Sequence, residues 1–158
     1  MPRELSMTGV LRVVTVRTAG QMADALTVRR AVFIEEQGVA EEEELDAHDG
    51  DPALVASAVH VVAYLDGRPV ATGRLLLDAP PGDAHVGRVA VLSEHRRHGC
   101  GRAVMEVLQY EARRRGYAGI ALAAQLHAIP FYERLGYVAR GDIFLDAGIE
   151  HREMSLRL

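Results

Sequence analysis

The chain has 158 residues, a length that suits one domain with a single hydrophobic core. Hydrophobic residues make up 49% of the chain and charged residues 25%, the composition of an ordinary globular protein, and the net charge of −4 argues against a nucleic-acid binder. No apolar run reaches the roughly 20 residues of a membrane-spanning helix, and the single cysteine, Cys100, excludes an intramolecular disulfide. We therefore expect a cytoplasmic protein whose partners include neither membranes nor nucleic acids.

The N-terminal part is predicted to contain a leader, a strand, a helix and a long acidic loop. Residues 1–10 lack the apolar segment of a signal peptide, so we expect a short leader before a single domain that spans 11–158. β-Branched residues indicate a strand over 11–17, and apolar residues at helical spacing indicate a helix over 21–34. The acidic stretch 39–56 has two interpretations, a solvated loop or a rim that attracts a cationic amine.

Three strands are predicted in the middle of the chain. Residues 58–65 and 68–77 are apolar and are separated by Asp66-Gly67, which predicts a hairpin. The third strand, 85–92, changes the parity of its apolar positions near Gly87-Arg88. This one-residue slip predicts a β-bulge, which would splay the strand from a neighbour and free backbone groups for a ligand.

The C-terminal part adds two helices and three strands. In chain order they are a helix from 101 to about 115, a strand at 120–124, a short helix at 127–135, and an antiparallel pair at 138–140 and 150–157 joined by 144–151. The whole order predicts an α/β fold with a mixed sheet and helices on both faces. No metal site is predicted, because Asp46-Ala47-His48-Asp49 has no cysteine partner and no regular spacing.

A short basic loop joins the strand that ends near Leu92 to the helix that begins near Gly101. The first amides of a helix have no internal partner and lie at the positive end of its dipole, so they can bind an anion. Gly99 and Gly101 lack a Cβ, which lets a phosphate approach the backbone. The glycine spacing fits neither the P-loop nor the dinucleotide-binding fingerprint. We predict a pyrophosphate site formed by Arg96, Arg97, His98, Gly99, Cys100, Gly101 and Arg102.

Two motifs resemble those of the GNAT superfamily of N-acetyltransferases. Arg96-x-x-Gly99-x-Gly101 matches its Arg/Gln-x-x-Gly-x-Gly/Ala signature, and Phe131-Tyr132-x-x-x-Gly136-Tyr137 matches a second motif. The resemblance implies a mostly antiparallel sheet with a splayed central strand, and acetyl-CoA as the co-substrate without a metal. It also implies that the loop amides bind the pyrophosphate and that Val89, Ala90 and Val91 pair with the pantetheine arm. Phe131 is assigned to the coenzyme site as well, although a core aromatic would fit its position.

Further matches extend the resemblance to the ElaA-like branch of the superfamily. They are Arg30-x-x-Phe33-x-x-Glu36-Gln37, Glu44-x-Asp46, Ala124-Gln125 and Phe144-Leu145-x-x-Gly148-Ile149-x-His151. The chain departs from the branch at Glu150, where proline is usual. The resemblance leaves the acceptor amine open, as a small molecule or a peptide, and it makes a homodimer one of the expected states.

Acyl transfer from a thioester to an amine needs an acid, an oxyanion donor and a base. The resemblance implies that Tyr132 is the acid that protonates the departing thiolate, and a backbone N–H around Val91 could polarise the carbonyl. The candidate bases are Glu36, His127, Asp146 and His151, among which the sequence does not choose, and Gln125, His127 and His151 are predicted to line the acceptor side. The alternative function is a non-catalytic domain that binds or senses acyl-CoA.

Overall fold

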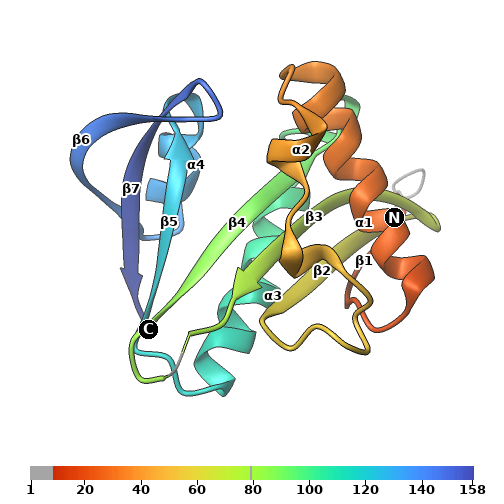
Figure 1. The fold of residues 1–158 in the computed structure, drawn as a ribbon, viewed down its shortest axis with the longest axis horizontal. Coiled ribbons are helices and arrows are strands. Elements are labelled where there is room, and N and C mark those ends of the chain that lie inside the picture. The colour runs from red at the N-terminus through yellow and green to blue at the C-terminus, as the bar shows by residue number, and fades with distance from the viewer. Residues whose placement is uncertain (1–8, 79) are drawn as a thin grey trace.

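The computed structural model describes residues 9–78 and 80–158, so residues 1–8 of the predicted leader lie outside the described part. The described residues form a seven-stranded sheet in the order β1-β2-β3-β4-β5-β7-β6 (Figure 1). Neighbouring strands are antiparallel except for the parallel pair β4 and β5. The strands are β1 (Leu11–Thr15), β2 (Ala58–Leu65), β3 (Arg68–Leu76), β4 (Asp83–Val91), β5 (Gly119–Gln125), β6 (Val138–Asp146) and β7 (Ile149–Arg157).

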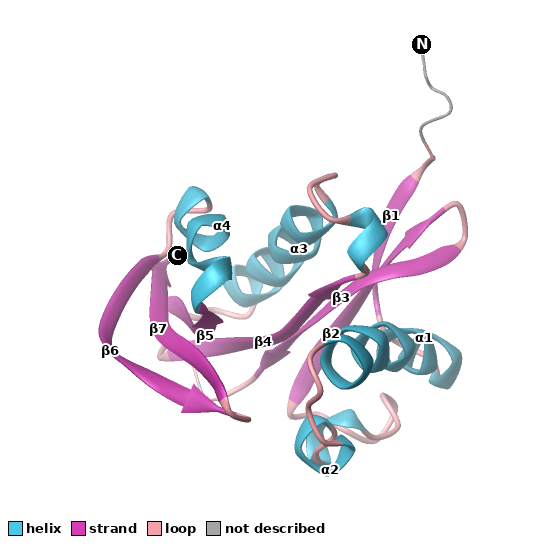
Figure 2. Cartoon of the chain, turned by 90° about the horizontal axis from the view of Figure 1, so that it is seen from above, coloured by secondary structure: helices cyan, strands magenta, loops and turns pink. Residues whose placement is uncertain are grey.

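Helices cover both faces of this sheet, as expected. The helix pair α1 and α2 lies on one face, and α3 and α4 lie on the other (Figure 2). The helical segments are α1 (Ala19–Arg29), the π-helix η1 (Arg30–Glu36), α2 (Glu41–Glu44), η2 (Ala47–Asp49), η3 (Ser93–His95), α3 (Cys100–Arg114), η4 (Leu126–Ala128) and α4 (Ile129–Arg134). None of these helices in the described part has the length and hydropathy needed to span a bilayer. The predicted mixed α/β architecture is confirmed.

The main core lies between the sheet and α3. The apolar face of α3 buries Val104, Met105, Leu108 and Ala112 completely, and these side chains join a cluster with residues of β2, β3 and β5. The helix therefore holds its N-terminus at a fixed place beside the end of β4, because the packing of its apolar face determines where the whole helix sits. This is the end that carries the predicted pyrophosphate loop.

The predicted bulge lies in β4. Thr72 of β3 pairs with Ala90, but Arg74 pairs with Gly87, so one residue of β3 faces two residues of β4. Arg88, one of these two, has a φ of 53°, which is the local distortion that the extra residue requires. The parity slip in the sequence therefore located the bulge correctly.

The strands β4 and β5 separate beyond this point. Their pairing runs only from Asp83–Gly119 to Val86–Leu122, after which the two strands diverge (Figure 1). The predicted splay is confirmed. It leaves the end of β4 and the end of β5 without a strand partner on their facing sides, which opens the sheet to a ligand.

The C-terminal hairpin differs from the prediction. β6 extends to Asp146, so residues 144–151 are strand ends and a tight turn at Ala147-Gly148 instead of a long connection. The pairing register shifts between Arg140 and Phe144, and Gly141 within this interval has a φ of 72°. This irregularity breaks the two-residue alternation that a sequence pattern needs, so the strand was predicted too short.

The acidic segment 39–56 is neither a fully solvated loop nor a free rim. Glu44 is 3% exposed, and its carboxylate contacts Arg29 Nε at 2.6 Å and Arg88 Nε at 2.8 Å. Asp49 pairs with Arg29 at 2.6 Å and, with Asp46, holds the guanidinium of Arg74. These buried ion pairs attach the segment to α1, β3 and the β4 bulge. In the run of four glutamates at 41–44, the first three are exposed and Glu44 is buried.

Loss of the Glu44 charge is expected to destabilise the protein. Glu44→Gln removes one carboxylate partner from the buried guanidinium of Arg29 and from the partly exposed guanidinium of Arg88, so the free energy of unfolding should fall by about 2–3 kcal/mol in chemical denaturation. The matched control is Glu41→Gln, which removes an ion pair with Arg30 whose side chains are both about half exposed. That control should cost less than about 1 kcal/mol. Equal losses for the two variants would contradict a structural role for the buried pairs.

Candidate active site

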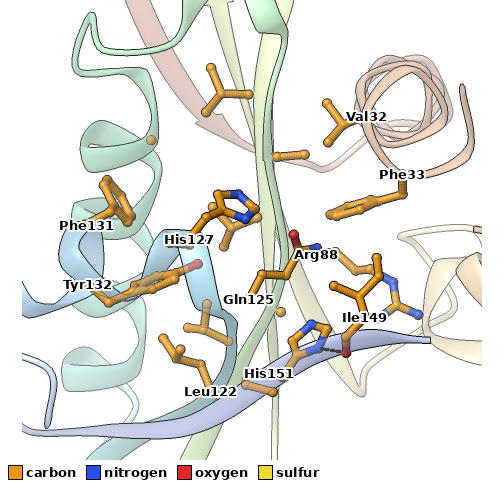
Figure 3. Close-up of a pocket in the computed structure, with 18 of the residues that line it drawn as sticks. Val32, Phe33, Arg88, Leu122, Gln125, His127, Phe131, Tyr132, Ile149 and His151 are labelled. Atoms are coloured by element: carbon orange, nitrogen blue, oxygen red, sulfur yellow. Dashed lines mark hydrogen bonds between the residues drawn. The ribbon is translucent and has the colours of Figure 1, made fainter. Parts of the chain in front are cut away.

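The splay opens into a cleft of about 1410 Å³ that is lined by both halves of the sheet. Figure 3 shows side chains from η1, β4, β5, α4 and β7 that converge on it. The cleft brings together most of the predicted site residues, namely Glu36, Val89, Ala90, Val91, Arg96, Arg97, Gly99, Gly101, Arg102, Gln125, His127, Phe131, Tyr132, Asp146 and His151. His98 is exposed in the same loop, and Cys100 is buried beneath it, where burial raises the pKa of its thiol.

The loop before α3 presents a row of unbonded amides. His95 N–H donates to Leu92 O and Ala103 N–H donates to Gly99 O, which fixes the loop at both ends. Between them, the amides of residues 97–102 donate to no acceptor in the described part of the chain. Most of these residues are exposed, and a row of free donors at a helix N-terminus is suited to an anion.

Gly101 lies where the loop approaches the floor of the cleft. A Cβ at this position would be 3.3 Å from Phe131 Cζ and 3.5 Å from Val91 Cγ2, so a larger side chain would have to project outward. Phe131 packs edge-on against Tyr132, with ring centroids 4.9 Å apart. Phe131 therefore supports the loop from below, which places it both beside the predicted coenzyme site and against the core.

The end of β4 directs a backbone donor into the cleft. Leu92 N–H donates to Val70 O, and Ala90 pairs with Thr72, so these residues point their backbone groups at β3. Because backbone groups alternate along a strand, the N–H and C=O of Val91 point the other way, toward the space that β5 has left. The Val91 carbonyl accepts a hydrogen bond from Arg96 Nε at 2.9 Å. The Val91 amide is thus a donor aimed at the cleft.

Tyr132 faces this donor from the opposite wall. α4, which begins at Ile129 and has Pro130 in its first turn, carries the ring so that its hydroxyl points into the cleft, near His127 (Figure 3). The residue is 8% exposed, and burial raises the pKa of its phenol well above the ordinary value. The phenol therefore stays protonated at neutral pH and can donate a proton.

Glu36 is tied to the coenzyme loop. The π-helix η1 ends at Glu36, whose carboxylate oxygens accept two hydrogen bonds from Arg96, both at 2.7 Å. These hydrogen bonds hold the pKa of Glu36 below its usual range. A carboxylate with this partner is a weak base, so its position favours a role in holding the loop.

The two candidate histidines differ in how they are held. His151 is 8% exposed, stacks on Phe144, and places its Nδ1 2.7 Å from the carbonyl of Ile149. A carbonyl only accepts, so we assign the proton to Nδ1, which leaves Nε2 as an acceptor on the cleft side. His127 is exposed on η4, and Asp146 is exposed at the rim.

Two lining residues were not predicted to be functional. Arg88 points its side chain into the cleft region from the bulge, and the bulge itself was the only signal in the sequence that could have drawn attention to it. Gln37 exchanges two hydrogen bonds with Gln125, of 3.2 and 2.9 Å, across the opening. No local pattern predicts this pair, because 88 positions separate the two residues.

Comparison with known proteins identifies the family. The sequence model of the acetyltransferase (GNAT) family matches residues 24–137. The chain belongs to the GNAT family. This chain is 37% identical over 145 residues to YjcF, an uncharacterized N-acetyltransferase of Bacillus subtilis. The match covers 91% of this chain and 98% of YjcF. The predicted resemblance is therefore confirmed.

Solved structures share the fold over nearly its full length. An acyl-CoA N-acyltransferase from Pseudomonas aeruginosa superposes on this GNAT chain with a TM-score of 0.75 at 30% identity, covering 92% of this chain and 99% of the other. ElaA of Escherichia coli has a TM-score of 0.76 at 23% identity, with the same coverage of 92% and 99%, and shows the common fold. The family and these relatives support an N-acyltransferase that uses a coenzyme A thioester.

Proposed function

We propose that the protein is an acetyl-CoA-dependent N-acetyltransferase in which a primary amine attacks the thioester directly, in a ternary complex. The observation that carries this proposal is the juxtaposition in one cleft of free loop amides, the Val91 N–H and the Tyr132 phenol. The loop amides suit a diphosphate. The Val91 N–H suits the negative charge that develops on the thioester oxygen, and the Tyr132 phenol suits the charge on the departing sulfur. No acid, donor or anion site has to be supplied from elsewhere.

Different segments of the chain would bind the two parts of the coenzyme. The amides of 97–102 would hold the pyrophosphate, with Arg97, His98 and Arg102 adding positive charge around it. Gly99 leaves open space at the backbone for a phosphate oxygen, because a Cβ there would meet no atom within 4 Å. The unpaired side of β4 at Val89 and Val91 would hydrogen-bond the pantetheine arm in place of the missing strand partner. In the proposed complex the thioester would lie between β4 and Tyr132.

The reaction then needs a hydrogen bond to the developing oxyanion, a base and an acid. The Val91 N–H donates to the thioester oxygen as negative charge develops there during attack by the neutral amine. A base removes the proton that the amine nitrogen gains on attack. As the tetrahedral intermediate collapses, the C–S bond breaks and Tyr132 gives its proton to the departing thiolate. The coenzyme thiol and the amide leave, and Tyr132 is reprotonated from solvent.

We assign the base to His151. Its Nε2 is the acceptor nitrogen of a ring that the Ile149 carbonyl and Phe144 hold in one orientation. Glu36 is already engaged by Arg96, and His127 has no comparable support. His151→Gln is expected to lower kcat by about 10²-fold with little change in CoA affinity, as measured by thiol release and calorimetry. A larger loss of kcat in His127→Gln than in His151→Gln would transfer the role to His127.

The proposal is tested by turnover of the unmodified protein. Release of free CoA should require both acetyl-CoA and an amine, in a panel that includes polyamines, amino acids and peptide N-termini. The acetylated product should appear in the same amount as the free thiol. The competing function, a domain that only binds or senses acyl-CoA, predicts tight CoA binding without thiol release for every amine.

A further inference from the structure

Two consecutive residues at the end of the π-helix reach the two diverging strands. Glu36 bonds Arg96, which lies just beyond the end of β4, and Gln37 bonds Gln125, which is the last residue of β5. All four side chains line the same cleft. The C-terminal end of η1 therefore spans the opening of the splay and contacts each of its sides.

The first contact fixes the side that carries the backbone donor. The guanidinium of Arg96 uses two nitrogens for Glu36, at 2.7 Å each, and its Nε for the Val91 carbonyl at 2.9 Å. Val91 is thereby held from two directions, by Arg96 and by its place opposite Ala71 in the sheet. The hydrogen-bonded chain from η1 thus holds the peptide group that follows Val91, at the end of β4 where the Val91 amide lies.

The second contact fixes the side that carries the acid. Gln37 Nε2 donates to Gln125 Oε1 at 3.2 Å, and Gln125 Nε2 donates to Gln37 Oε1 at 2.9 Å. The chain continues from Gln125 through η4 directly into α4, which carries Tyr132. Figure 3 shows Gln125 between Tyr132 and Phe33, in the middle of the cleft. A shift of Gln125 would carry the first turn of α4 with it.

Few other hydrogen-bonded side chains connect the two sides. Within the described residues, hydrogen-bonded side chains link 9–118 to 119–158 at two places, the Gln37–Gln125 pair and the bond from Tyr137 to Gln109. The second lies outside the cleft, between the end of α4 and α3. Backbone pairing of β4 with β5 ends at Val86 and Leu122, well below the opening. Among the described residues, the Gln37–Gln125 pair is thus the side-chain hydrogen-bonded link across the open end.

We infer that Glu36 and Gln37 form a clamp that sets the gap between the Val91 amide and the Tyr132 phenol, and that Gln37 and Gln125 are positioning residues for acyl transfer. The inference rests on the proposed function, because the gap matters only if both groups act on one thioester. A misplacement of about 1 Å at reacting groups costs up to about 10²-fold in rate. Leucine at either glutamine position keeps the approximate volume and removes the hydrogen bonds.

The kinetic test compares Gln37→Leu, Gln125→Leu and the double variant with Gln109→Leu as the matched control. We expect kcat with acetyl-CoA to fall by about 10–100-fold in each clamp variant, with the CoA dissociation constant within about threefold of wild type. The double variant should be no worse than the singles, because one link is lost in each case. Gln109→Leu loses a similar amide link outside the cleft and should keep kcat within about twofold. A clamp variant with wild-type kcat, or a control that loses as much, would overturn the inference.

A distance measurement tests the clamp without turnover. Cysteines for spin labels are placed at the exposed positions Glu94, next to the end of β4, and Glu133, on α4, in a Cys100→Ala background. Gln125→Leu should broaden the label-to-label distance distribution relative to its parent, and Gln109→Leu should not. Identical distributions in the parent and Gln125→Leu would refute the clamp. If the wild type failed to acetylate any amine while Gln125→Leu still broadened the distribution, the proposed function would fail and the clamp would stand as a structural device.

Discussion

Tyr132→Phe is expected to lower kcat by about 10²–10⁴-fold, the usual contribution of a general acid, while CoA affinity stays near the wild-type value. Burial raises the pKa of this phenol, so it is protonated in the neutral range, and the buried Tyr132 lines the cleft from α4. Phenylalanine keeps the edge-on contacts with Phe131 and Tyr137. The loss should therefore appear in the chemical step, measured as single-turnover thiol release.

Tyr137→Phe is the matched control for this experiment. Burial raises the pKa of Tyr137 as well, but its hydroxyl donates to Gln109 at 2.9 Å, outside the cleft. Its removal should cost about 1 kcal/mol of stability and leave kcat nearly unchanged. A Tyr132→Phe enzyme that turned over at the wild-type rate would remove Tyr132 from the mechanism.

Gly101→Asp is expected to raise the CoA dissociation constant by about 10³-fold, because two charges about 4 Å apart repel by roughly 4 kcal/mol near a protein surface. The new carboxylate adds a negative charge to the loop that is proposed to hold the diphosphate, and its Cβ would lie 3.3 Å from Phe131 Cζ. Gly101 lies in the first turn of α3, so the fold should tolerate the change. Calorimetric titration with CoA measures the affinity, and thermal unfolding checks the fold.

Arg113→Gln provides the control for net charge. It changes the charge by the same single unit on an exposed residue of the same helix, at the far end from the loop. Its CoA affinity should stay within about twofold of wild type. Unaltered affinity in Gly101→Asp would mean that the pyrophosphate binds elsewhere.

The proposed coenzyme side of the candidate site could be located from the sequence because its parts are local. Gly99 and Gly101 stand directly before a helix whose apolar face is clear, and the parity slip at Gly87-Arg88 marks the bulge within one strand. Tyr132 occupies a short motif on one helical turn. Each of these signals lies within a few residues of the structure it predicts.

The rest of the site depends on contacts between distant segments. Arg96 and Glu36 are 60 positions apart, and Gln37 and Gln125 are 88 positions apart, so neither pairing leaves a periodic trace in the sequence. The π-helix that brings Glu36 and Gln37 to the cleft looks the same as an α-helix in its apolar spacing. The sequence of the acidic segment reveals its charge but does not predict the ion pairs of Glu44, because Glu44 and its two arginine partners come from three different elements.

The bend in β6 has a consequence for crowded solutions. β6 is the outermost strand, and a flat outer strand offers its unpaired backbone groups as a template for a strand of another molecule. Gly141 has a φ of 72°, which bends the strand. Arg152 Nε donates a hydrogen bond to the Gly141 carbonyl at 3.0 Å. The bend therefore prevents a second molecule from forming a continuous row of backbone hydrogen bonds along β6. The side chains of Ile143 and Leu145 remain exposed on this strand. Straightening the strand, for example by removing the glycine, would favour fibrous self-association.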